Sequence, residues 1–395
     1  MMIQAVLGNP NHPEYGVATI PFPIPHDQYA HCMELLEALE IGDAVKTDCK
    51  VEKIDSFYTV LKRAEMLTVN VEELNYLAKR LESFDTGEAA QFQAMAHKLK
   101  LFELKDFINL TFCCQQATVI TDFSDLAAVG RDHYMNLHGG SASVDELNKL
   151  DGEETARRLI ENGSGKITPY GVVYDNGMKL EQVYDGRFFP CYYYEPNVIT
   201  VAVTSKAEPE DTEHITWLYL PMVQEEIDRA LLRGGITDPA DVRLRLEDSQ
   251  LPNEVDVLLD MEYETLSDLN ELAAATDGLS KADMEKLGAV VTLAEPKSAA
   301  QIKTLAENLD LFDFAPGTHT PEEYGKYMIR QSGHFDYDEN LDAFYDYEKY
   351  GTERMNAEDG MFTDRGYIAY KGYYSMEEVM NGSQSSHMEM GGFSR

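Results

Sequence analysis

The chain has 395 residues, and its 70 acidic against 33 basic side chains give a formal net charge of −37. This balance argues against direct binding to nucleic acid or to an anionic membrane, because phosphate contacts need a basic face. Disorder is not indicated, because 44% of the residues are hydrophobic and aromatic residues are frequent. Five cysteines without metal-binding spacing, no signal peptide and no long apolar run predict a soluble, cytoplasmic protein.

Short β-branched and aromatic runs open the chain, and helical patterns follow them. Residues 3–7 and 17–22 are predicted to be strands that a turn-rich loop joins as a hairpin. A helix starts near Asp27. Apolar residues at helical spacing then predict two more helices, over residues 71–81 and 88–99.

The end of the first half mixes helix and strand. A single helix is predicted over residues 147–160. Asn176-Gly177 is a strong signal for a type I′ turn, so strands over residues 169–174 and 179–184 are predicted to form a hairpin around it.

The second half repeats the order of the first. Strands are predicted over residues 199–204 and 215–220, with an acidic helix behind them. Helices over residues 266–275 and 281–293 follow, and Ser280 is the predicted N-cap of the second one.

The chain also matches itself at an offset of about 200 residues, which is the signature of an internal repeat. Four pairs of segments match in the same order: 18–23 with 216–221, 74–78 with 269–273, 99–103 with 309–313, and 165–171 with 360–366. Ordered matches at a nearly constant spacing predict two tandem copies.

The predicted fold class is α+β, an elongated tandem repeat of small mixed α/β and helical domains with a strongly acidic surface. The α+β, helical and C-terminal α/β domains of the first copy are predicted to span residues 1–68, 69–115 and 116–188. The α+β, helical and acidic C-terminal domains of the second copy are predicted to span residues 196–264, 265–315 and 316–374. Residues 375–395 are predicted to be a disordered tail.

Catalytic and cofactor motifs are absent from the sequence. Gly163-Ser164-Gly165-Lys166 has Ile160 where a phosphate-binding loop needs its first glycine. The ten histidines show no zinc-ligand spacing. His133 and Cys113 can be imagined as base and nucleophile, but a surface histidine and a core cysteine are the simpler interpretation. We therefore predict no catalytic residue, no metal and no cofactor, and hence no enzyme.

Acidic residues are concentrated in the second half, where residues 201–395 carry 40 acids and 16 bases, against 30 and 17 in residues 1–200. Two clusters stand out. The first cluster interleaves acids with aromatic residues and consists of Asp336, Asp338, Glu339, Asp342, Asp346, Glu348, Glu353, Glu358 and Asp359. The second cluster has no base between its acids and consists of Glu247, Asp248, Glu254, Asp256, Asp260, Glu262, Glu264 and Asp268.

Such clusters are most simply a solvated face that keeps a protein soluble. The size of the imbalance favours a functional reason, because holding tens of like charges on one folded surface costs self-repulsion. The most direct functional reason is binding to a basic partner. Among common cellular surfaces, DNA-binding grooves are the most basic. Duplex DNA carries one charge per roughly 1.7 Å of its axis, so the excess charge matches about 60 Å of duplex.

Several segments of the second copy follow the pattern of a known family. They are the strand over residues 199–204, the segment 215–221 that ends in Tyr219-Leu220-Pro221, the helix with Leu269-Asn270-Glu271-Leu272, and the tyrosine-rich segments 324–327 and 344–351. Together they resemble the ArdA antirestriction proteins of plasmids and conjugative transposons.

Members of that family are small, elongated, often dimeric three-domain proteins that mimic bent B-form DNA and occupy the DNA-binding groove of type I restriction–modification enzymes. The resemblance implies that the acids of the two clusters stand in for phosphates. It also implies that the partner is the modification and specificity core of such an enzyme. With two copies in one chain, we expect a monomeric pseudo-dimer or a homodimer. An acidic adaptor from a mobile element that binds another basic protein, and an enzyme with an unrecognised site, are the alternatives.

Overall fold

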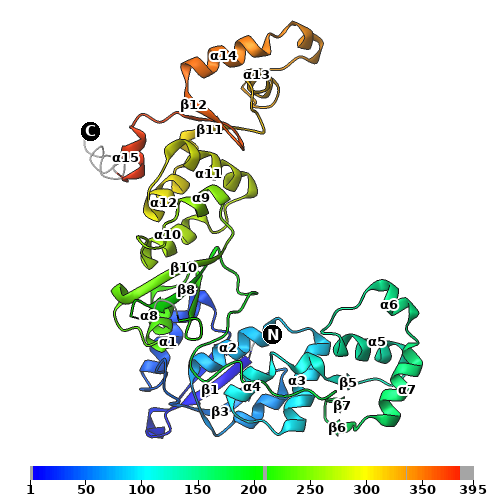
Figure 1. Cartoon of the computed structure of the whole chain (residues 1–395). Coiled ribbons are helices and arrows are strands. Elements are labelled where there is room, and N and C mark those ends of the chain that lie inside the picture. Colours follow the sequence, from blue (N-terminus) through cyan, green and yellow to red (C-terminus); the bar gives the residue numbers. More distant parts are fainter. Residues whose placement is uncertain (1–2, 208–210, 335, 383–395) are drawn as a thin grey trace. The chain divides into compact units, whose positions relative to one another are not determined.

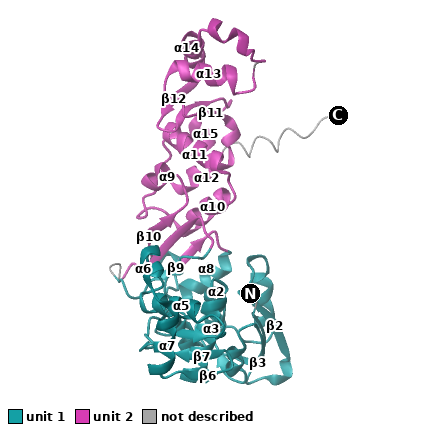
Figure 2. Cartoon of the chain, turned by 90° about the vertical axis from the view of Figure 1, so that its right-hand side faces the viewer, with its two compact units in different colours: residues 1–195, 210–217, 223–241 teal, residues 196–209, 218–222, 242–395 magenta. Residues whose placement is uncertain are grey.

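The computed structural model describes residues 3–207, 211–334 and 336–382 (Figure 1). The chain forms two compact units (Figure 2). Unit 1 comprises residues 1–195, 210–217 and 223–241, and unit 2 comprises residues 196–209, 218–222 and 242–395. The described residues form small sheets and many helices, which agrees with the predicted α+β class.

Unit 1 begins with a four-stranded antiparallel sheet in the order β2-β1-β3-β4. Its strands are β1 (Ile3–Gly8), β2 (Val17–Phe22), β3 (Cys49–Asp55) and β4 (Thr68–Val69). Gly8 lies opposite Val17, so the predicted hairpin of the first two strands is confirmed. Alternate residues of both strands are buried, and α1 (Tyr29–Glu37) packs against β2.

Helices follow this sheet, and a second, smaller sheet comes after them. The three helices are α2 (Val71–Glu82), α3 (Thr86–Leu99) and α4 (Leu104–Leu110). The second sheet has the order β5-β7-β6 and consists of β5 (Thr118–Ile120), β6 (Lys166–Thr168) and β7 (Gly171–Tyr174). Three helices lie between β5 and β6 in the chain: α5 (Leu126–Leu137), α6 (Val144–Lys149) and α7 (Gly152–Asn162). Helix α8 (Gln224–Arg233) also belongs to unit 1.

Two predictions for this part of the chain were wrong. The single helix over residues 147–160 is two helices, because Asp151 accepts a hydrogen bond from Glu154 N and caps a new helix, α7, there. Asn176-Gly177 does not join a hairpin, because residues 179–184 form no strand and β7 pairs instead with β5 and β6.

A three-stranded sheet in the order β10-β8-β9 follows, and all of it except Thr216 and Trp217 belongs to unit 2. Its strands are β8 (Ile199–Ser205), β9 (Thr216–Leu220) and β10 (Val242–Ser249). The helical part of unit 2 consists of α9 (Asn253–Leu258), α10 (Leu266–Thr276), α11 (Lys281–Ala294) and α12 (Ala299–Glu307). Helix α11 then packs against a last sheet in the order β11-β13-β12, formed by β11 (Phe312–Pro316), β12 (Asp359–Thr363) and β13 (Gly366–Tyr370).

Two helices pack closely on each other between β11 and β12 in the chain: α13 (Pro321–Arg330) and α14 (Tyr347–Ala357). A short 3-10 helix, η7 (Glu339–Phe344), connects them. The start of the predicted tail forms α15 (Met376–Met380), which packs against α12, and residues 383–395 lie outside the described residues. Among the helices that the structure describes, none is long and apolar enough to cross a lipid bilayer.

The two halves of the chain use the same local devices. The Asn75 side chain accepts a hydrogen bond from Ile24 N at 2.8 Å, and the Asn270 side chain accepts one from Met222 N at 2.8 Å. Both first sheets carry a register shift in the strand that pairs with the central strand, in β3 and in β10. Both last sheets place their third strand in chain order at the centre, as β7 and as β13.

Candidate partner-binding surface

All the acids of the two clusters lie in unit 2. The first cluster follows the connection from α13 to α14, including η7, and then α14 and the start of β12. The second cluster follows the end of β10, then α9 and the turn that leads into α10. Both clusters therefore lie on or next to regular elements, which hold side chains more firmly than long loops do.

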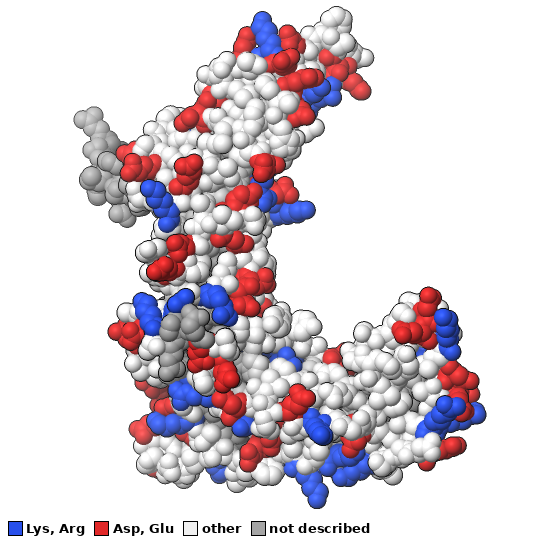
Figure 3. Space-filling view, viewed as in Figure 1, with Lys and Arg blue, Asp and Glu red and all other residues white. Residues whose placement is uncertain are grey.

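Eleven of the 17 acids are exposed. They are Asp336, Asp338, Glu339, Asp346, Glu348, Glu353 and Asp359 in the first cluster, and Glu247, Asp248, Asp260 and Glu262 in the second. On the face shown in Figure 3, acidic side chains lie in separate groups, with basic side chains next to some of them. These eleven carboxylates are accessible to a partner.

The other six acids are half-buried. Asp342 accepts hydrogen bonds from the Tyr337 hydroxyl at 2.7 Å, from the Tyr347 hydroxyl and from Arg330. These donors lower the pKa of Asp342 to about 2. Its charge is therefore used to tie η7 to the helices on either side of it.

Two more half-buried acids are held by arginines. Glu254 on α9 receives two hydrogen bonds from Arg365, at 2.8 and 2.7 Å, and this contact lowers the pKa of Glu254. Glu358 pairs with Arg354 and accepts the Tyr324 hydroxyl at 2.7 Å. A paired carboxylate of this kind offers little net charge to a partner.

The remaining three acids are Asp256, Glu264 and Asp268, which lie on or next to helices and are partly shielded from solvent. Glu264 accepts Ala299 N at the start of α12, and Asp268 shares a hydrogen bond with the Thr265 hydroxyl at the start of α10. Burial raises the pKa of Glu264 and of Asp256. Through its contact with Ala299 N, Glu264 stabilises the start of α12, because a carboxylate at a helix N-terminus satisfies free N–H groups.

The aromatic residues of the first cluster divide into two kinds. Tyr347 is buried and Tyr337 is half-buried, as expected for anchors that fix the segment to a core. Phe344 is instead 83% exposed, and Leu341 on the same 3-10 helix is 48% exposed. The sequence analysis missed these two residues, because an aromatic–acid pattern does not tell which rings point inward.

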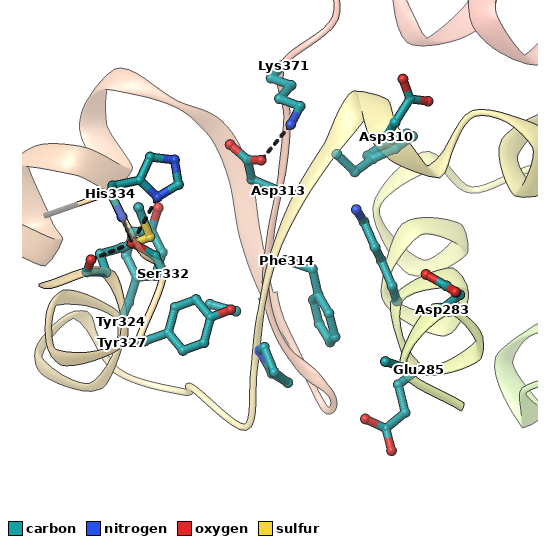
Figure 4. Close-up of a pocket in the computed structure, with 16 residues that line it drawn as sticks. Asp283, Glu285, Asp310, Asp313, Phe314, Tyr324, Tyr327, Ser332, His334 and Lys371 are labelled. Carbon is teal, nitrogen blue, oxygen red and sulfur yellow. Dashed lines mark hydrogen bonds and ion pairs between the residues drawn. The ribbon is translucent and has the colours of Figure 1, made fainter. Parts of the chain in front are cut away.

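Unit 2 also contains an open pocket of about 470 Å³ between α11, β11 and α13. Figure 4 shows Asp283 and Glu285 on its α11 side and Tyr327 on its α13 side. Lys371 Nζ donates to Asp313 Oδ1 at 2.8 Å, so that this pair of charges is satisfied. The pocket is thus lined by acidic, basic and aromatic side chains, and its like charges do not converge on one position.

One Ser–His contact lines this pocket. His334 Nδ1 lies 2.8 Å from Ser332 Oγ, but that hydroxyl donates to Met328 O at 2.5 Å. The serine therefore donates its proton to a backbone carbonyl oxygen and not to the histidine ring. An activated nucleophile needs its proton directed at the base, so this pair does not have that arrangement.

The other residues considered for chemistry are also structural. The Cys113 thiol is buried and donates to Asn109 O at 3.7 Å, while His133 Nδ1 lies 2.9 Å from Thr118 Oγ1. All five cysteines are free. No group of three or more acidic, histidine or cysteine side chains suited to hold a metal ion occurs among the residues that the structure describes.

Comparison with known families gave a match for the part of the chain that contains both acidic clusters. Residues 212–369 match the family model of the antirestriction protein ArdA. A search of curated proteins found no match. The matched residues include both acidic clusters, the helical part of unit 2 and its last sheet. Over residues 212–369 the chain is therefore similar to the ArdA antirestriction family.

Proposed function

We propose that this protein is a DNA-mimic antirestriction protein that occupies the DNA-binding groove of a type I restriction–modification enzyme. In this role it protects the incoming DNA of a mobile, conjugative element and works in the cytoplasm, where restriction takes place. The observation that carries the proposal is that all 17 acids of the two clusters fall within the ArdA match, and eleven of them are exposed.

Exposed carboxylates replace phosphates in this role. A DNA-binding groove gains much of its affinity by releasing counterions when its lysines and arginines meet phosphates. Carboxylates on a folded surface offer the groove the same kind of contact. Because the charge is spread over many residues, a single substitution should change affinity little, and reversing several charges at once should change it strongly.

The two copies in one chain are part of the same proposal. Residues 1–188 lie outside the matched range, but their strand orders and their Asn75 contact have counterparts in the second half. A duplication of one ancestral unit explains this correspondence. A single chain then supplies the two copies that a dimer would supply, as a monomeric pseudo-dimer without catalytic activity.

A displacement titration tests the function. A type I methyltransferase core is loaded with labelled duplex and titrated with the protein at physiological salt, with polyglutamate of equal charge as a control. We expect release of the duplex near one-to-one stoichiometry, which polyglutamate does not match. Release no better than polyglutamate would instead favour an acidic adaptor for another basic protein.

A charge-reversal variant tests the surface. We expect the combined change of Asp336, Glu339, Glu348 and Glu353 to Lys to weaken displacement by at least tenfold, because it turns four exposed carboxylates of the first cluster into repulsive charges. The matched control reverses four exposed acids of unit 1: Glu34, Glu37, Asp145 and Glu161. Equal loss in both variants would mean that only total charge matters.

A further inference from the structure

An apolar stripe projects from the middle of the first acidic cluster. Phe344 is 83% exposed and Leu341 is 48% exposed, and both belong to η7. In a 3-10 helix, residues three apart lie on the same face. The two side chains therefore form one stripe on the surface of unit 2.

The backbone on both sides of this stripe is fixed. At its start, the Asp338 side chain accepts Asn340 N at 2.9 Å, and Leu341 N donates to Asp338 O at 3.0 Å. Inside it, Asp342 receives the hydroxyls of Tyr337 and Tyr347. A surface that is already ordered loses little conformational entropy on binding.

Exposed carboxylates surround the stripe. Glu339 belongs to the same 3-10 helix, and Asp346 and Glu348 begin the helix that follows. An aromatic face among carboxylates suits an arginine, whose planar guanidinium stacks on a ring while its charge meets an acid. Arginine is also a residue that a DNA-binding groove presents in quantity.

We propose that Phe344, supported by Leu341, is the apolar anchor of the partner contact and stacks with an arginine of the basic groove that the surrounding acids attract. The inference rests on the proposed function. It adds Phe344, a residue that the DNA-mimic function itself does not require. Phosphates give DNA only a salt-sensitive contact with such an arginine. The stripe adds an apolar contact, whose binding free energy depends on the area removed from water and is not screened by salt. The affinity of the groove for the protein, relative to its affinity for duplex, should therefore increase as salt rises.

The test is the displacement titration with Phe344→Ala at several salt concentrations. We expect about a tenfold loss of affinity, as for the truncation of a central aromatic anchor. This loss should be the same at every salt concentration, so that the slope of log affinity against log salt is unchanged. The four-acid reversal described above should instead flatten that slope, because fewer counterions are released.

Two further variants control the test. Phe344→Tyr keeps the ring and should keep the affinity of the unchanged protein. Tyr373→Ala removes a fully exposed ring of unit 2 that lies outside both clusters, and it should have no effect. None of the three substitutions, Phe344→Ala, Phe344→Tyr and Tyr373→Ala, changes a buried side chain, so folding should be preserved in all of them.

The outcomes separate this inference from the proposed function. If Phe344→Ala displaces duplex as well as the unchanged protein, or alters the salt slope as the acid reversal does, the anchor is overturned while the DNA-mimic function stands. If the acid reversal also has no effect, the DNA-mimic function falls as well.

Discussion

Arg233 joins separate segments of unit 1 through one side chain that is only 5% exposed. Its guanidinium lies 4.4 Å from the centre of the Phe189 ring. It also donates hydrogen bonds to three carbonyl oxygens, those of Ala44, Gly186 and Arg187. Two further hydrogen bonds go to Asn70 Oδ1 and to the Tyr184 hydroxyl. Tyr184 in turn donates to Glu73 at 2.8 Å. A buried cation needs such partners, because losing water without them costs several kcal/mol.

Replacing Arg233 by Met should therefore destabilise unit 1 by about 3 to 5 kcal/mol, since it leaves several buried oxygens without their donor and removes the cation that lies 4.0 Å from the Glu73 carboxylate. Urea unfolding followed by the fluorescence of Trp217, the only tryptophan, measures the change. Arg158→Met is the control, because that side chain is 72% exposed, and it should shift stability by no more than about 0.5 kcal/mol. Equal unfolding of both variants would contradict this role of Arg233.

At the same scale, the sequence could locate the acidic residues but could not tell which of them are half-buried and paired and which are exposed. Asp342 and Asp346 stand four residues apart with similar neighbours, yet one is held by two tyrosines and an arginine while the other is exposed. The partner of Glu254 is Arg365, more than 100 residues away in the chain. Contacts between such distant residues exist only after folding.

At the scale of elements, glycines allow two helix pairs to approach closely. In unit 2, a Cβ on Gly351 would lie 1.8 Å from Pro321 O, and one on Gly325 would lie 2.0 Å from Tyr347 O. In unit 1, a Cβ on Gly130 would lie 1.9 Å from the carbonyl oxygen of Gly152. Backbones this close leave no room for any side chain, so each helix pair depends on its glycines.

Gly351→Ala should push α13 and α14 apart and destabilise this helix pair by about 1 to 3 kcal/mol, the usual cost of overpacking. Faster hydrogen exchange of the amides in both helices is the expected reading. Thr352→Ala, at the next and exposed position of the same helix, should leave exchange unchanged or slow it. Protection equal to that of the unchanged protein would mean that the helices adapt without strain.

Most elements followed from local patterns. The strands at residues 3–8 and 17–22, and the helix that Ser280 caps, needed only side-chain alternation, helical spacing and capping chemistry. The Asn-Gly hairpin failed for a tertiary reason. The backbone of Tyr184 is held by the Asn109 side chain, through N–H to Oδ1 at 2.7 Å and Nδ2 to O at 3.0 Å, which takes the place of strand pairing.

At the scale of the whole molecule, acid is distributed unevenly along the chain. Residues 196–264 alone carry 16 acids and 5 bases, whereas residues 1–68 carry 10 and 5. The sheets that begin these two segments share a strand order, β2-β1-β3 and β9-β8-β10, but the segments differ strongly in charge. This difference supports the proposal that the second half of the chain contacts the partner.

If the two copies act as a pseudo-dimer, the purified protein should be a monomer. Sedimentation equilibrium should give a single species of 44.6 kDa at micromolar concentration and at physiological salt. Self-repulsion between strongly acidic chains supports the same expectation. A stable species of twice this mass would show instead that each chain still needs a second one.

The sequence by itself determined the charge, the ArdA resemblance and most helices and strands, because these depend on composition and on residues close together in the chain. Only the tertiary structure decided which acids are exposed and which are half-buried, that Phe344 is exposed to solvent, and that Arg233 lies buried in unit 1. Burial and pairing are set by segments that meet from distant positions, so no local pattern contains them.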